Sequence, residues 1–277
     1  MALSILNNIP SLAASNQLSI TGANLQSTLF RLSSGSRINS GADDAAGLAI
    51  ADGLRANVTG LSQSARNAND GVGQLQVADG ALAQVTNLLN RAVTLATEAS
   101  TGTVSSSQRT ALNSEFVSIK AEIDRIGSKT TFNGTSVFSA TATSIFLSDA
   151  SSNSTIAVTV GALSSSAIGS SSPVDLSVND LTTAANATTA LGNINTAIQR
   201  VASDRGTVGA SINRLQAAVN VINNQVQNLT AAEDGIRAAD IAQEVANLTR
   251  FSILNQTGIS ALAQANSHQQ SVLALLR

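Results

Sequence analysis

Apolar residues recur at alternating spacings of three and four along most of this chain, and this pattern constrains its fold more than any other feature. The most regular run consists of Leu191, Ile194, Ile198, Val201, Arg205, Val208, Ile212, Leu215, Val219, Ile222, Val226 and Leu229. Such an alternation places the apolar side chains on one face of an α-helix, as in a coiled coil. A helix from about Leu181 to Ala232 would span roughly 75 Å, which is the length of a rod.

Two other segments carry the same alternation. One runs through Leu54, Val58, Leu61, Ala65, Ala68, Val72 and Leu75, then takes an extra three-residue step to Ala78 before Leu82, Val85, Leu89, Ala92 and Ala96. The other contains Leu112, Phe116, Ile119, Ile123 and Ile126. The extra step overwinds a coil locally. We therefore predict a mainly α fold, a long antiparallel helical bundle or coiled-coil rod.

The helical pattern stops between about residues 132 and 178. Two short apolar runs, Ile145–Leu147 and Ile156–Val160, flank a polar stretch at residues 149–154. Ile156, Val158 and Val160 alternate with Ala157 and Thr159, and two such short runs on either side of a turn indicate a β-hairpin or a small β patch. The Ser- and Gly-rich stretch Ser164–Pro173 is typical of a surface loop.

Both ends of the chain lack charge. No Asp, Glu, Lys or Arg precedes Arg31, and none occurs from Phe251 to Leu276. Disorder is one interpretation, but disordered segments are usually charged and poor in Leu and Ile. The alternative that we favour is burial, which leaves few positions where a charge could reach water.

The spacing at both ends supports burial through pairing and self-assembly. We predict a self-assembly seam whose apolar members are Leu18, Leu25, Leu29, Leu32, Val245, Leu248, Ile259, Leu262, Leu273 and Leu276. Ser252, Asn255 and Asn266 occupy seam positions between them, and polar seam residues specify register.

Composition argues against several other classes. There is no Cys, His268 is the single histidine, and no metal or cofactor site is expected. The net charge of −2 does not suit a nucleic-acid-binding protein. The N-terminal sequence does not read as a signal peptide, and no apolar run is long enough for membrane insertion.

One segment carries a family resemblance. The sequence from Leu32 to Ile50, LSSGSRINSGADDAAGLAI, resembles the N-terminal signature of bacterial flagellins. Asn69-Asp70-Gly71, Phe132-Asn133-Gly134 and the C-terminal run from Ala261 are similar to the same family. The resemblance covers about residues 1–138 and 190–277, with a short middle.

The resemblance implies a short-form flagellin without large outer domains. Residues 1–42 and 240–277 would form a terminal coiled-coil domain, and residues 43–239 a helical core domain with the hairpin. The implied function is that of a non-enzymatic filament subunit, secreted by type III export into the extracellular flagellum. The implied partners are other copies, the filament cap, junction proteins, an export chaperone and a host Toll-like receptor. The alternatives are a hook–filament junction protein and a secreted effector or adhesin with flagellin-like ends.

Two groups of site residues follow. In the signature loop, Gly35 permits a backbone turn, while Asp43 and Asp44 are expected to cap the next helix rather than act as a catalytic pair. Arg31 and Arg37 are expected to bridge to carboxylates. The resemblance also implies receptor recognition by Arg91, Leu95 and Glu115, although Glu98 stands where the activating pattern has Gln, and Leu95 could instead be a core residue.

Overall fold

The computed structural model describes residues 8–147, 155–169 and 173–275. Its elements in chain order are α1 (Ile9–Ser34), α2 (Ala45–Ser100), α3 (Ser106–Lys129), β1 (Thr131–Phe132), β2 (Thr135–Ser136), β3 (Thr143–Phe146), β4 (Thr155–Val158), α4 (Ala184–Arg237) and α5 (Ile241–Leu275). The prediction of a mainly α fold is confirmed. None of the described helices is long and apolar enough to cross a membrane.

The chain divides into two compact units. One consists of Met1–Ala56 with Asn228–Arg277, and the other is Asn57–Gln227. The boundaries between these units fall inside α2 and α4, whereas the domain boundaries expected at residues 42/43 and 240 fall at the connections between helices. The assignment of residues 1–42 and 240–277 to one domain therefore stays a prediction.

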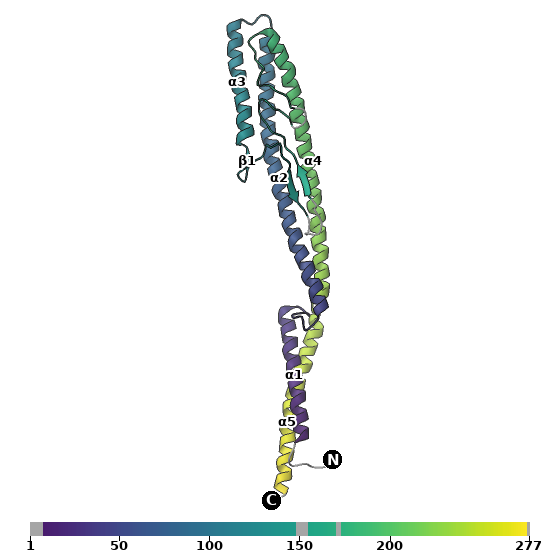
Figure 1. The fold of residues 1–277 in the computed structure, drawn as a ribbon. Coiled ribbons are helices and arrows are strands. Elements are labelled where there is room, and N and C mark those ends of the chain that lie inside the picture. The colour runs from purple at the N-terminus through teal and green to yellow at the C-terminus, as the bar shows by residue number, and fades with distance from the viewer. Residues whose placement is uncertain (1–7, 148–154, 170–172, 276–277) are drawn as a thin grey trace. The chain divides into compact units, whose positions relative to one another are not determined.

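In the second unit, α2 and α4 lie antiparallel with α3 beside them (Figure 1). Leu75, Ala78 and Leu82 are all at most 2% exposed, so the extra three-residue step in α2 is a feature of its packed face. On α4, Val201, Val208, Leu215 and Ile222 are buried at intervals of seven residues. The core of this unit therefore follows the predicted seams closely.

Local signals explain where α3 begins and how α2 ends. Ser105 and Gln108 form a capping box, in which each side chain binds the backbone N–H of the other residue. Arg109 Nε donates to the carbonyl of Ala99 at 2.8 Å, and its Nη2 donates to the carbonyl of Thr101 at 2.9 Å. The guanidinium thus satisfies carbonyl groups left unpaired at the end of α2.

Two hairpins follow α3. In the predicted one, β3 and β4 pair antiparallel with Ile145 opposite Ile156, which confirms it. The turn expected at residues 149–154 lies outside the described residues. The other hairpin, β1–β2, turns through Asn133 and Gly134, whose φ angles of 49° and 77° are those of a type I′ turn.

The segment after β4 is bound to the surface of α3. Asp124 accepts hydrogen bonds from the backbone N of Ser165 at 2.6 Å and from its Oγ at 2.9 Å. Lys120 Nζ donates to the carbonyls of Ser177 and Asn179. Ile168 is fully buried, so the prediction of a surface loop at Ser164–Pro173 is wrong for this residue.

Candidate assembly site

The two ends of the chain lie against each other as antiparallel helices. In the first unit α1 and α5 run side by side (Figure 1). A Cβ on Gly258 would lie 3.2 Å from Leu18 Cδ1, so the leucine fills the space that the glycine leaves. Ser11 Oγ donates to Asn266 Oδ1 at 2.9 Å, and Asn8 Nδ2 donates to the carbonyl of Ala265 at 3.2 Å. The pairing therefore extends along most of α1 in one register.

The face of α5 that packs on α1 is displaced by one residue from part of the predicted seam. Its buried or half-buried positions are Glu244, Asn247, Leu248, Phe251, Asn255, Gly258, Leu262 and Ala265. Leu248 and Leu262 belong to it, but Val245 and Ile259 are 45% and 54% exposed. Leu273 lies within α5, its side chain is not described, and Leu276 lies outside the described residues.

The corresponding face of α1 contains three of its four predicted residues. Leu18, Leu25 and Leu32 are half-buried, and Leu29 is 48% exposed. Thr21 and Thr28, each 4% exposed, lie on the same face and were not predicted. The hydroxyl of Thr21 donates to the carbonyl of Gln17 at 2.8 Å, which satisfies it within the helix.

A second apolar set lies outside this pair of faces. Its exposed members are Ile9, Leu12, Ile20, Leu29 and Phe30 on α1 and Ile241, Val245, Ile253, Leu254 and Ile259 on α5. Phe30 is 62% exposed and Ile20 is 55% exposed. The helix pair carries little charge, so these side chains leave apolar area available for contact with a partner. We call this set the outer apolar surface.

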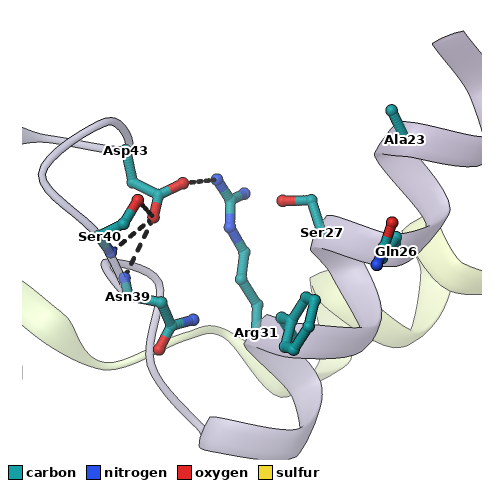
Figure 2. Close-up of a pocket in the computed structure, with 8 residues that line it drawn as sticks. Ala23, Gln26, Ser27, Arg31, Asn39, Ser40 and Asp43 are labelled. Carbon is teal, nitrogen blue, oxygen red and sulfur yellow. Dashed lines mark hydrogen bonds and ion pairs between the residues drawn. The ribbon is translucent and has the colours of Figure 1, made fainter.

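The connection from α1 to α2, residues 35–44, is shaped by its own side chains. Gly35 ends α1 with φ 68°, a conformation that favours glycine. Asp44 Oδ1 accepts from the backbone N of Gly47 at 2.8 Å and caps α2. Asp43 Oδ2 instead accepts from the backbone N of Asn39 and of Ser40 and folds the loop back on itself (Figure 2).

Arg31 joins this loop to the C-terminal helix. Its Nη2 lies 3.5 Å from Asp43 Oδ1, and its Nη1 lies 3.6 Å from Glu244 Oε1 (Figure 2 shows the Asp43 side). Hydrogen bonds from Ser40 and Asn39, together with Arg31, hold the pKa of Asp43 below its ordinary value. Arg31 thus forms the carboxylate bridge that we expected of it.

Arg37 makes a different contact from the expected one. Its Nη2 donates to the carbonyl of Ile236 at 3.1 Å, and its backbone N donates to the carbonyl of Arg237 at 2.7 Å. Ser36 pairs with Ala238 as an isolated β-bridge. The two connections that flank the helix pair are therefore joined by backbone hydrogen bonds.

Sequence reasoning missed Glu244. It is 8% exposed, and its Oε2 has no hydrogen-bond partner within the described structure. The available signal was that Arg31 is the first charged residue of the chain. Arg31 lies in the last turn of an otherwise uncharged helix. Burying its guanidinium against α5 is favourable only if α5 supplies a carboxylate, so an acidic residue of α5 could have been sought as its partner.

The three residues that the resemblance implies for receptor recognition do not share one environment. Arg91 Nε donates to Glu115 Oε1 at 2.7 Å and Arg91 Nη2 to Glu115 Oε2 at 3.0 Å, a bidentate pair between α2 and α3. The bond from Arg91 lowers the pKa of Glu115. Both side chains are exposed, whereas Leu95 is 1% exposed and belongs to the core.

Comparison with known proteins matches this architecture to one family. The family model described as bacterial flagellin N-terminal helical region matches residues 5–143, and the one described as bacterial flagellin C-terminal helical region matches residues 191–276. A flagellin of Halalkalibacterium halodurans is 38% identical over 99% of both chains. The flagellar filament 33 kDa core protein of Treponema phagedenis is 34% identical over 99% of both chains. A crystal structure of Bacillus cereus flagellin, 33% identical, covers 61% of this chain and 94% of its own, with a TM-score of 0.49.

The chain belongs to the flagellin family, which is a family of structural proteins. It is a structural subunit of the bacterial flagellar filament, of the short form without a large outer domain. The match along nearly the whole of both chains favours this function over the junction-protein and effector alternatives.

Proposed function

We propose that the chain polymerises through the outer apolar surface of α1 and α5. The pair leaves Ile9, Leu12 and Ile20 more than half exposed although these residues precede every charged residue in the chain. Burying them against neighbouring copies removes apolar area from water, which stabilises association by about 25 cal/mol per Å². This exposed surface is the observation that carries the proposal.

The same proposal gives the predicted seam residues two roles. Leu18, Leu25, Leu248 and Leu262 hold α1 to α5 within one subunit. Leu29, Val245 and Ile259, which are exposed, face other subunits in the polymer. Contacts between unlike surfaces of successive copies give an open helical filament when their rotation does not close into a ring. In this proposal residues 1–42 and 240–277 act as the terminal coiled-coil domain and residues 43–239 as the core domain.

A charge placed on the outer apolar surface tests the proposal. We expect Ile20→Asp to prevent polymerisation, because the carboxylate would have to be buried without a partner. Ile20→Asn, which is nearly isosteric with Asp but uncharged, should only raise the critical concentration. Sedimentation and electron microscopy under polymerising conditions measure both, and circular dichroism of the monomer should be unchanged. Normal filaments from Ile20→Asp at the wild-type critical concentration would contradict the proposal.

The proposal also includes a location and further partners. The subunit is exported by the flagellar type III pathway and forms an extracellular filament, where it meets the cap, junction proteins and an export chaperone. The resemblance to flagellins over both helical regions supports this part. No catalytic role is proposed, since Asp43 and Asp44 are each engaged by backbone N–H groups that shape the loop.

Recognition by a host Toll-like receptor is proposed for the α2–α3 surface around Arg91 and Glu115. These two side chains are exposed and form a bidentate pair, while Leu95, one turn further along α2, is buried in the core. We expect Arg91→Glu to abolish the response of reporter cells to monomer, because it replaces the pair with two like charges. Glu122→Gln, on the outside of α3, serves as the control. An equal response to Arg91→Glu and wild type would contradict receptor binding at this surface.

A further inference from the structure

Arg205 is the charged residue in the otherwise apolar α4 seam, and it has one partner of opposite charge on α2. Its Nε donates to Asp79 Oδ1 at 2.7 Å and its Nη2 to Asp79 Oδ2 at 3.2 Å. Both side chains are 39% exposed, so the pair lies at the edge of the core between Val201 and Val208. A bidentate pair fixes direction as well as distance.

The position of Asp79 on α2 is equally specific. The three–four alternation that ends with Leu75 would continue to residue 79, which would bury an aspartate. The extra three-residue step moves the buried position to Ala78, which is fully buried. Asp79 is thereby turned to the edge of the packed face, where Arg205 reaches it. The three-residue step at Ala78 in α2 and the charge of Arg205 in α4 therefore lie at the same height along the pair of helices.

Most of the other buried residues of α2 and α4 are Ala, Val, Leu or Ile repeated at heptad spacing, so a shift by one heptad would keep apolar residues opposite one another. Leu215, which lies 3.4 Å from a Cβ built on Gly71, makes a further contact that such a shift would change. If α4 slipped by seven residues, Asp79 would face the level of Ile198 or Ile212, and Arg205 would face that of Val72 or Thr86. Both charges would lose their partner, which is unfavourable to an extent limited by their 39% exposure.

We propose that the Asp79–Arg205 pair, acting with the phase step at Ala78, selects the register of α2 against α4. The two residues are positioning residues, and their contribution is to the uniqueness of the packing. A single polar residue at a seam position has this effect in coiled coils, at a cost in stability. Hydrogen bonds from Arg205 also lower the pKa of Asp79, as a favourable pair requires.

The register can be measured directly because the chain contains no cysteine. Spin labels on Asn87→Cys and Ala210→Cys would report the distance between exposed positions of α2 and α4. A slip of seven residues moves one helix along the other by about 10 Å. Wild-type monomer should give a single distance.

Asp79→Leu/Arg205→Leu should give a second, displaced distance, with the slipped population raised about two- to fivefold over wild type, as the coupling energy of a solvent-screened ion pair implies. The melting temperature of this double leucine variant should be equal to or above that of wild type, because replacing a partly buried ion pair by apolar residues is often neutral or stabilising. The exchanged pair Asp79→Arg/Arg205→Asp should return the single distance. If the double leucine variant lost stability but showed no displaced distance, the pair would contribute to stability without selecting the register, and the proposal would be overturned.

Asp79→Asn, which keeps the shape of the side chain, is the second variant. It should show the displaced distance at a lower population than the double leucine variant. A single wild-type distance in both Asp79→Asn and Asp79→Leu/Arg205→Leu would overturn the proposal. These distances are measured in the monomer, so the result does not depend on polymerisation through the outer apolar surface.

Discussion

Replacing Gly127 by alanine is expected to destabilise the protein by about 1–3 kcal/mol, the usual range for overpacking of a core. Gly127 is buried on α3, and a methyl group there would overlap the carbonyl oxygen of Leu163. The obstacle is backbone and cannot rotate away. Nor can it move freely, because Asp124 holds Ser165, two residues further on, by two hydrogen bonds.

Gly209→Ala provides the matched control. Gly209 lies inside α4, and a Cβ built on it meets no atom within 4 Å. This substitution should stabilise the protein by about 0.5–1 kcal/mol, because alanine is the better helix former. Urea unfolding of the two variants beside wild type measures the difference. If Gly127→Ala were as stable as Gly209→Ala, the close approach of the 163–165 segment to α3 would be wrong.

Arg31→Met is expected to open the α1–α5 pair. Removal of the guanidinium leaves the carboxylate of Glu244, which is 8% exposed, without its cation. Stranding a buried charge costs about 1–3 kcal/mol. The loss falls on the first unit, so it should appear as faster hydrogen exchange of the α1 and α5 amides, with the α3 amides unchanged.

A second substitution separates this cause from a loss of packing. Arg31→Met/Glu244→Gln removes the charge as well as its partner, and we expect it to recover most of the protection, since replacing both members of a pair is nearly neutral. Arg250→Met, at an exposed arginine on α5, should change nothing. Protection that stays low in the double variant would show that Arg31 acts through packing and not through Glu244.

Periodicity alone predicted the helices well but could not choose the face of α5 that packs on α1. Positions 245, 252 and 259 and positions 244, 251 and 258 differ by one residue, and both sets combine with 248, 255 and 262 into a three–four alternation. The choice depends on particular contacts. Gly258 admits Leu18, and Glu244 reaches Arg31, whereas Val245 and Ile259 remain exposed.

The two hairpins, in contrast, depend on signals that lie within a few residues of the sequence. The alternation at Ile145 and Ile156 was sufficient to predict β3 and β4, because a strand period needs only a few residues. The turn at Asn133-Gly134 has an equally local signal, because Asn-Gly favours a type I′ turn, so the sequence is also sufficient to predict the β1–β2 hairpin.

The sequence by itself determined that the chain is helical, that its two uncharged ends pair, and that it resembles flagellins. Each of these follows from residue types repeated along the chain, whose effect on the backbone and on solvation is local. Only the tertiary structure decided that Glu244 receives Arg31, that Leu95 is a core residue and that Arg205 faces Asp79. These contacts join residues far apart in sequence, and each depends on the register between two helices, which periodicity leaves open.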